Sequence, residues 1–185
     1  MSAYQRLVVP GGTYFFTVRL QDRASRLLVE RVDLLRAACR LCIARWPMQI
    51  DTAVILPDHL HMIWTLPAGD GDFSARWRLI KSTFSRHVAG PEHVSSSMAA
   101  RGEKGVWQRR FWEHLIRDEA DLAAHRTFAL NAPVRAGLVA RAQDWPLSSL
   151  QRDLRLGRGP RLDRAAGYWP VLSPVPGATY AQWVG

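Results

Sequence analysis

The chain has only two cysteines, and no part of it is apolar over a long stretch. Cys39 and Cys42 form a Cys-x-x-Cys pair, which could be a redox motif or half of a zinc site. There is no second pair, and residues 29–45 have apolar side chains at helical spacing, so we expect two buried helical thiols. No segment resembles a signal peptide or a membrane span, and we therefore expect a cytoplasmic protein without a membrane partner.

Lysine is also scarce, although the chain is strongly basic. Lys81 and Lys104 are the only lysines among 25 basic residues, and the formal net charge is +9 at pH 7. Arginine forms paired hydrogen bonds with phosphate and guanine and stacks on bases, so this composition favours a nucleic-acid partner. A GC-rich genome also raises the arginine content, and composition alone therefore supports this partner only modestly.

The remaining composition predicts one folded domain. Apolar residues make up 48% of the 185 residues, which is enough for a core. Segments rich in β-branched and aromatic residues predict strands over 13–20, 48–56, 59–66 and 106–116. Helical spacing predicts helices over 29–45, 73–88 and 118–131. The order β-α-β-β-α-β-α is typical of an α+β fold, a ferredoxin-like sandwich in which helices pack on an antiparallel sheet.

We expect this domain to span residues 1–150, followed by a basic tail over 151–185 that is rich in Arg, Gly and Pro. Arg152, Arg155 and Arg158 begin a series in which arginine recurs at every third residue. The tail is expected to lie on the protein surface or on DNA, and a solvated tail is an equally good interpretation. We expect a monomer.

Two histidines that are separated by a single residue carry the most information about the chemistry of the chain. Side chains two apart on a strand share a face, so His59 and His61 should project together. Two imidazoles on one face are good ligands for a divalent cation, although two ordinary strand histidines would show the same spacing. Glu113 or His114 could be a third ligand, but only one of them can face the ion, and a structural role is an alternative for both.

The segment around these histidines resembles the HUH motif of REP-associated tyrosine transposases, which are relatives of the IS200/IS605 transposases in the HUH single-tyrosine class. The resemblance continues in other blocks, which lie in the family's order between about Tyr4 and Leu150. The matching blocks are Gly11–Val18, Pro57–Pro67, Arg76–Lys81, Gly105–His114, Asp118–Asp121 and Pro133–Val139.

This resemblance implies a ferredoxin-like catalytic domain that acts on single-stranded DNA. The HUH histidines of the family hold Mg²⁺ or Mn²⁺, which polarises the scissile phosphate, and a helix tyrosine attacks that phosphate to form a 5′-phosphotyrosine. The implied partners are hairpins of repetitive extragenic palindromes (REP) with a short single-stranded foot. The implied reaction is metal-dependent cleavage and joining of DNA strands.

The chain departs from the family at the nucleophile. Aligned from either side without a gap, the tyrosine position holds Phe128, and the position of an asparagine that often completes the metal site holds Ala132. Phenylalanine has no oxygen and cannot attack phosphorus, so we expect this chain to be deficient in cleavage. It would then be either an engineered trapping variant or a natural copy that lost cleavage. A natural non-catalytic hairpin-binding protein and a small metal-dependent hydrolase are the alternative functions.

Several basic residues are candidates for DNA contacts. Trp107 could stack on bases, although most of the eight tryptophans are expected in the core. Arg109 and Arg110 are neighbours on a predicted strand, so one of them should face the DNA and the other the solvent. The full set of candidates is Arg76, Arg78, Lys81, Arg86, Trp107, Arg109, Arg110, Arg152, Arg155 and Arg158.

Overall fold

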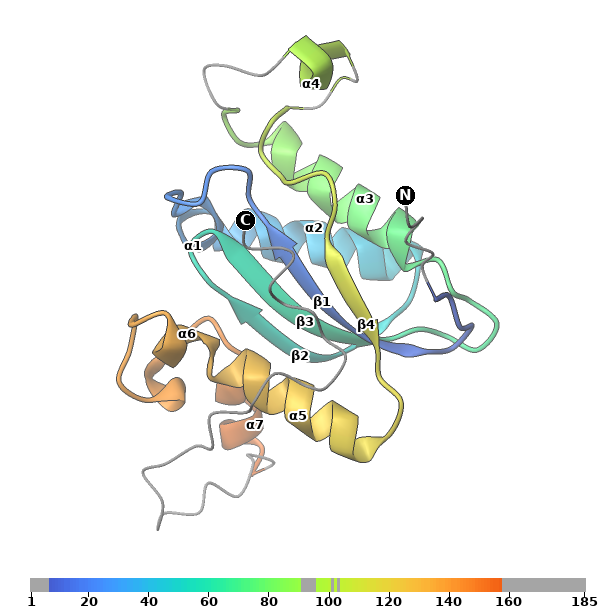
Figure 1. The fold of residues 1–185 in the computed structure, drawn as a ribbon, viewed down its shortest axis with the longest axis vertical. Helices are drawn as coiled ribbons and strands as arrows, with labels where there is room; N and C mark the ends of the chain where they lie inside the picture. The colour runs from blue at the N-terminus through green and yellow to red at the C-terminus, as the bar shows by residue number, and fades with distance from the viewer. Residues whose placement is uncertain (1–6, 91–95, 101, 103, 158–185) are drawn as a thin grey trace, which may run out of the picture.

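The computed structural model describes residues 7–90, 96–100, 102 and 104–157. Its centre is a four-stranded antiparallel sheet in the order β2-β3-β1-β4. The strands are β1 (Thr13–Arg19), β2 (Gln49–Ile55), β3 (His59–Thr65) and β4 (Trp112–Leu115). This strand order and the intervening helices are those of a ferredoxin-like α+β sandwich, as the sequence predicted (Figure 1).

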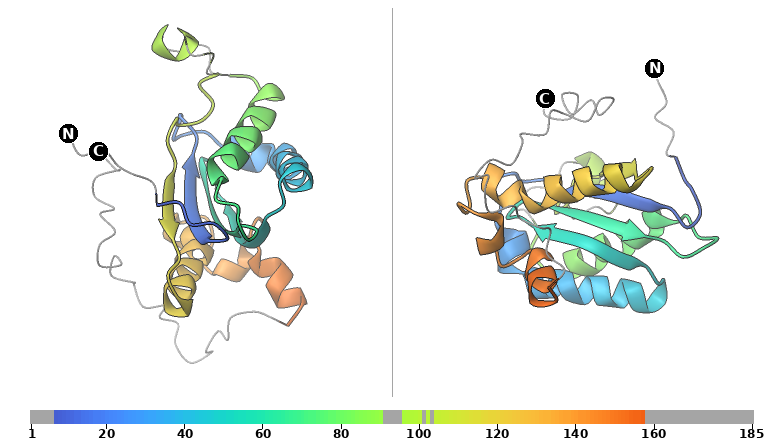
Figure 2. Two further views of the ribbon diagram at one scale, coloured as in Figure 1. Left: turned by 90° about the vertical axis from the view of Figure 1, so that its right-hand side faces the viewer. Right: turned by 90° about the horizontal axis from the view of Figure 1, so that it is seen from below.

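Helices cover both faces of this sheet, which therefore forms the middle layer (Figure 2). One face carries α2 (Val32–Arg45) and α3 (Phe73–Arg86), which pack on each other. The other face carries α5 (Glu119–Leu130), which packs over β2 and β3. The shorter helices are α1 (Leu27–Glu30), α4 (Ser96–Ala100), α6 (Ala132–Arg135), the 3₁₀ turn η1 (Ala142–Asp144) and α7 (Leu150–Arg155).

Each face of the sheet has its own apolar core, because successive side chains on a strand point to opposite faces. Tyr14, Phe16 and Trp64 belong to the larger core, beneath α2 and α3. Phe15 and Ile63 belong to the smaller core, beneath α5. Cys39 and Cys42 are buried free thiols on α2, as predicted, and burial raises the pKa of Cys39 to about 12.

The strand predicted over 106–116 is wrong in length. Only Trp112–Leu115 pairs with β1, while the residues before it reach the sheet through a single bridge between Leu20 and Trp107. The Lys81 ammonium, on α3, donates to the Gln108 carbonyl at 2.8 Å. This contact with α3 occupies a backbone acceptor that a longer strand would use, so the segment leaves the sheet and lies along the helix.

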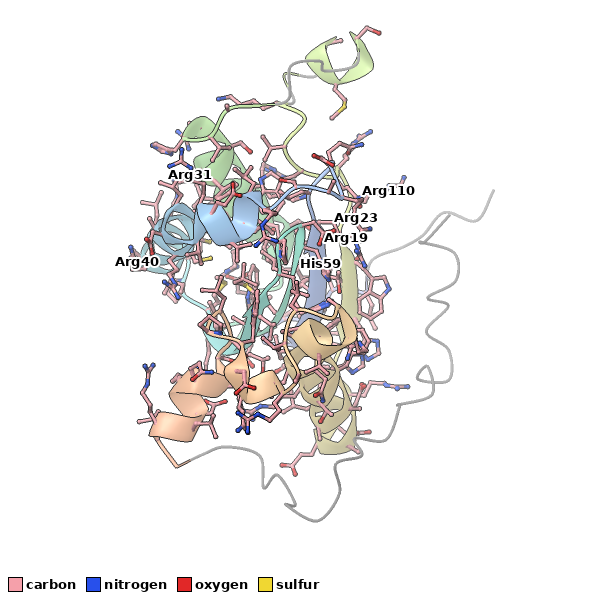
Figure 3. All side chains as sticks on the ribbon, turned by 90° about the vertical axis from the view of Figure 1, so that its left-hand side faces the viewer. Arg19, Arg23, Arg31, Arg40, His59 and Arg110 are labelled. Carbon is pink, nitrogen blue, oxygen red and sulfur yellow. The ribbon has the colours of Figure 1, made fainter. Side chains whose placement is uncertain are left out.

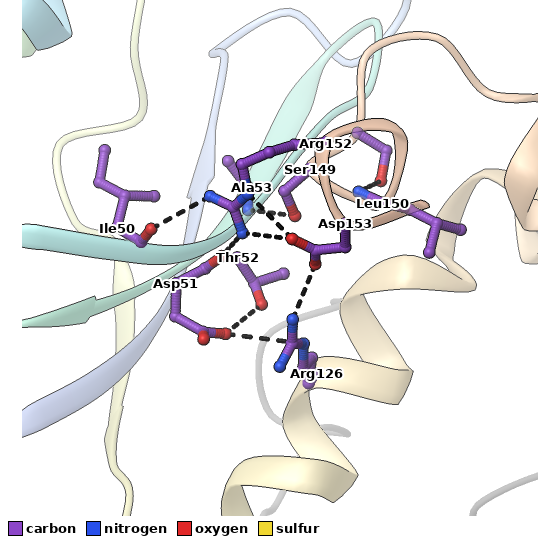
Figure 4. Close-up of polar contacts among 10 residues, drawn as sticks. Ile50, Asp51, Thr52, Ala53, Arg126, Ser149, Leu150, Arg152 and Asp153 are labelled. Carbon is purple, nitrogen blue, oxygen red and sulfur yellow. Dashed lines mark hydrogen bonds and ion pairs between the residues drawn. The ribbon is translucent and has the colours of Figure 1, made fainter. Parts of the chain in front are cut away.

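Helix α7 crosses the expected boundary between domain and tail at residue 150, and it is docked by buried charge. Asp153, whose side chain is 3% exposed, accepts from Arg126 on α5 at 2.7 Å and from the neighbouring Arg152 (Figure 4). Arg152 also donates to the Asp51 carbonyl on β2 at 2.7 Å. Residues 150–157 therefore belong to the folded domain, whereas Arg158 and the rest of the expected tail lie outside the described residues. None of the helices in the described ranges is long and apolar enough to cross a membrane.

Candidate functional site

The two motif histidines lie together on β3, on the face that α5 covers. Their ring centroids are 5.1 Å apart. The Nδ1 atom of His59 donates to the Asp58 carboxylate at 2.6 Å, and the Nδ1 atom of His61 bonds to the Thr17 hydroxyl at 2.9 Å. Because each Nδ1 is engaged, the Nε2 atom of each imidazole is left as the ligand atom.

The charge around the pair is unevenly distributed. Burial lowers the pKa of His61 well below its usual range, and the positive charges of His59, Arg135 and Arg19 lower it further, against an opposing effect of Asp58. His61 is therefore a neutral imidazole at pH 7, the form that binds metals. Burial alone would raise the pKa of Asp58, but hydrogen bonds from His59 and Arg23 outweigh it and hold that pKa at about 2.

Phe128, at the expected nucleophile position, faces this pair from α5. Its ring centroid is 5.4 Å from that of His61 and 6.0 Å from that of Phe15. The guanidinium carbon of Arg135, on α6, lies 4.0 Å from the centroid of the Phe128 ring, a cation–π contact. Sequence reasoning placed Phe128 opposite the histidines but missed Arg135, because only the turn between α5 and α6 folds it back over the ring.

The remaining expected ligand position contributes no donor atom. Ala132 is the first residue of α6, is 4% exposed and packs in the smaller core. The neighbouring Asn131 donates its side-chain amide to the Thr127 carbonyl at 3.1 Å, so it caps the end of α5. Neither residue replaces the asparagine that the resemblance implies.

Glu113 and His114 point to opposite faces of the sheet, as alternation predicts. Glu113 pairs with Phe16, in the larger core, whereas His114 pairs with Phe15 and faces α5. His114 does not join His59 and His61; it donates from Nε2 to the Asp121 carboxylate at 2.9 Å. Neither of the two possible third ligands therefore joins the histidine pair, and His114 belongs to a separate polar group.

This separate group consists of His114, Asp121 and His125, whose three ligand atoms lie within 4.8 Å of one another. The rings of His114 and His125 stack at 4.3 Å, and the His125 Nδ1 atom is 2.9 Å from the Asp121 carboxylate. Burial would raise the pKa of Asp121, but hydrogen bonds from His114 and Arg117 hold it at about 2.

In the structure, hydrogen bonds join this group and fasten the start of α5 to β4. The same donor set could also hold a metal ion. Sequence reasoning missed Asp121 as a partner of His114, although the spacing of Asp121 and His125, four apart on a predicted helix, was a usable signal.

The expected DNA contacts separate into exposed and structural residues. Arg76 is 2% exposed, and its guanidinium binds the Asp70 carboxylate at 2.7 Å and the Pro47 carbonyl at 2.8 Å. Trp107 is 8% exposed and packs in the larger core, so little of its ring is open to a base. Arg152 is committed to Asp153 and β2. We therefore assign these three residues structural roles, while Arg155 remains exposed at the end of α7.

The other five candidates gather on one surface. They lie along a single groove between α3 and the segment before β4, and two of them, Arg109 and Arg110, precede the strand on which they were expected. The five are Arg78, Lys81, Arg86, Arg109 and Arg110.

The histidine pair fits a divalent cation only in part. Two imidazole nitrogens suit Mn²⁺ better than Mg²⁺, which prefers oxygen ligands. A bound ion would need further oxygen ligands from DNA phosphate or water, because Ala132 and His114 supply none here. The nearby guanidiniums of Arg19 and Arg135 would repel an ion that arrived without an anion.

The chain is a basic α+β domain in which two imidazoles face Phe128 on α5, an arrangement suited to phosphodiester chemistry. Comparisons with known proteins identify its relatives. The chain is 42% identical over 160 residues to the REP-associated tyrosine transposase of Escherichia coli (strain K12). The matched region covers 86% of this chain and 89% of that relative. The chain is 38% identical over 156 residues to a putative REP-associated tyrosine transposase of Haemophilus influenzae, covering 84% and 89%.

A solved structure of a REP-associated tyrosine transposase bound to a REP hairpin superposes with a TM-score of 0.74 at 42% identity, covering 86% of this chain and 89% of the other. No family model matches the chain. The identity and coverage of these relatives show that the chain belongs to the family of REP-associated tyrosine transposases.

Proposed function

We propose that this chain binds single-stranded DNA hairpins of the REP type and holds a phosphate at the His59–His61 pair without forming a covalent bond to it. The observation that supports the partner is the 42% identity to a transposase whose structure contains a REP hairpin. A net charge of +9 supports the same partner, since positive charge provides most of the affinity for a DNA backbone.

The chain's own residues provide the parts of a phosphate site. His59 and His61 present two nitrogen atoms on one face, held in place by Asp58 and Thr17. Mg²⁺ or Mn²⁺ held there would act as a Lewis acid on the phosphate. Arg135 brings a positive charge from the α6 side that would neutralise a phosphate oxygen.

The nucleophile is the missing part. In a family member, a tyrosine hydroxyl at position 128 would attack the phosphorus and carry the DNA strand as a 5′-phosphotyrosine. The Phe128 ring holds the matching place beside His61 but has no oxygen. Water would have to attack instead, without a side chain that orients it, and this loses the advantage of a fixed nucleophile.

Two other functions compete with a disabled transposase. A natural hairpin-binding protein that never cleaves DNA shares every feature of the site and differs only in its history. A small metal-dependent hydrolase would use the same histidines but would show no preference for hairpin DNA.

The test is a competition experiment by fluorescence anisotropy. The labelled probe is a REP-like hairpin with a single-stranded foot, and the competitors are the same sequence scrambled so that it cannot pair, and a blunt hairpin. We expect the probe to bind at least tenfold more tightly than the scrambled strand. Equal affinity for all three DNAs would contradict hairpin recognition and favour the hydrolase.

A further inference from the structure

A groove of about 830 Å³ lies between α3 and residues 102 and 104–111, on the face of the sheet opposite α5. Six of its described lining residues are basic and none is acidic. On α3 the lining residues recur at 74, 77, 78, 81, 82, 85 and 86, which is one face of a helix. An anionic ligand is the chemistry that such a lining favours.

The two walls of the groove are close together. The Lys81 ammonium crosses from α3 to the Gln108 carbonyl at 2.8 Å, and the Lys104 ammonium crosses back to the Ser85 carbonyl at 3.2 Å. One lysine side chain therefore bridges the walls at each point. A space that one lysine side chain can span is too narrow for a DNA duplex, which is wider than its own major groove of about 12 Å. One extended strand is narrow enough to enter it.

The floor and the rim of the groove differ in chemistry. Lys81 lies over the rings of Trp107 and Phe111, 5.9 and 5.6 Å from their centroids, and so the floor presents a cation rather than a bare aromatic face. Arg78, Arg109 and Arg110 are exposed on the rim. This arrangement suits contacts with phosphates and sugars more than stacking on bases.

The groove is connected to the histidine pair through β1. The Gln108 amide donates to the Arg19 carbonyl at 3.0 Å, and Arg19 pairs with His59 across the β1–β3 ladder. Arg23 binds the Asp58 carboxylate, which in turn holds His59. Figure 3 shows Arg110, Arg23, Arg19 and His59 in a row that runs from one edge toward the middle of the view, with Arg31 and Arg40 on the opposite side.

We propose that this groove holds the backbone of the single-stranded DNA segment that continues from the phosphate at His59 and His61. Arg78, Arg86, Arg109 and Arg110 contact its phosphates from the two rims, and the strand passes Arg19 and Arg23 before it reaches the histidines. The duplex stem stays outside. This assignment rests on the proposed function, because it gives the path of a strand within a DNA-binding protein.

The test compares two variants that lose the same charge. The groove variant replaces the four exposed rim arginines by glutamine. It carries Arg78→Gln, Arg86→Gln, Arg109→Gln and Arg110→Gln. The control variant replaces four exposed arginines on and beside α2. It carries Arg31→Gln, Arg36→Gln, Arg40→Gln and Arg45→Gln.

Binding is measured by anisotropy on a hairpin with a single-stranded foot and on the same hairpin with a blunt end, over a range of salt concentrations. Each lost phosphate contact on a single strand lowers the slope of log K against log salt by about 0.7. We therefore expect the groove variant to lose about three units of slope and on the order of 600-fold affinity at 0.1 M salt for the footed hairpin. The control variant should bind like the parent.

The outcomes separate the two claims. If the parent protein binds neither hairpin, the proposed function fails and the groove assignment fails with it. If the parent binds and the two variants weaken equally, the groove assignment alone is overturned. Equal losses on footed and blunt hairpins would show that the rim contacts duplex and would overturn the single-strand assignment. If the fourfold change unfolds the protein, the Arg109→Gln, Arg110→Gln pair replaces it, with Arg31→Gln, Arg40→Gln as its control.

Discussion

The change Phe128→Tyr tests the proposal that the chain binds its DNA without cleaving it. Phe128→Tyr adds one oxygen to a ring whose centroid is 5.4 Å from that of His61. The Arg135 guanidinium lies 4.0 Å from the centroid of the same ring. At that distance a unit charge in bulk water is worth about 1 kcal/mol, which would lower the pKa of the new phenol by somewhat less than one unit. Most of the phenol would therefore stay protonated at pH 7, with a slightly larger fraction of phenolate, the form that attacks phosphorus.

The expected gain in cleavage rate follows from the value of a correctly placed nucleophile. An oriented intramolecular nucleophile is worth up to about 7–11 kcal/mol, and a partly assembled site realises only a fraction of this. We expect a rate gain of at least ~10²-fold, equivalent to about 2.7 kcal/mol. Phe128→Tyr with Ala132→Asn should gain more, because the amide oxygen would supply a metal ligand that Ala132 lacks.

The assay is denaturing gel electrophoresis of end-labelled hairpin DNA with Mn²⁺, in which a covalent adduct migrates with the protein. Phe128→Leu is the matched control, since it changes the same side chain without adding an oxygen. If the double variant folds and binds the hairpin as tightly as the parent but forms no adduct, position 128 is not the position of the nucleophile.

Three further predictions address the residues around the site. Arg135→Gln should weaken binding of the footed hairpin about fivefold at 0.1 M salt in an anisotropy titration, whereas Arg40→Gln should not; equal affinities would remove Arg135 from the phosphate site. Asp153→Ala should lower the free energy of unfolding, measured in urea, by about 2 kcal/mol. This value is below that of a fully buried ion pair because the side chains of Arg126 and Arg152 are 31% and 43% exposed. A loss below about 0.5 kcal/mol would refute the docking role of α7. Burial lowers the pKa of His125, so below about pH 6.5 the unfolded chain binds a proton that the folded chain does not. The free energy of unfolding should therefore fall from about pH 7.5 to about pH 5.5, and it should fall less steeply in His125→Asn. An unchanged dependence on pH in that variant would exclude His125 as a contributor.

The strand-level features of the site could be predicted from the sequence because they depend on local periodicity. His59 and His61 share a face by strand alternation, and Glu113 and His114 are divided by it. The helix that carries Phe128 begins at a cap, Asp118, that the sequence shows directly. These features require no knowledge of distant contacts.

The remaining features depend on contacts between distant parts of the chain. Arg76 looks like a surface residue by composition, but it is buried because Asp70 and the Pro47 carbonyl, 29 positions away, satisfy its guanidinium. Arg152 looked like part of a tail until its contacts with β2, about 100 positions away, placed it in the domain. The groove likewise joins α3 to a segment that the sequence assigned to a strand. The periodicity of a sequence does not predict contacts between segments that are far apart along the chain.

The central claim is that this chain binds its hairpin without a covalent step, and one incubation tests it. The unaltered protein is mixed with an end-labelled REP-like hairpin and Mn²⁺, and the mixture is divided between a native gel and a denaturing gel. We expect a shifted complex on the native gel and only full-length free DNA on the denaturing gel. A labelled band that migrates with the protein on the denaturing gel would contradict the account, because it would show that a residue other than Phe128 supplies a nucleophile.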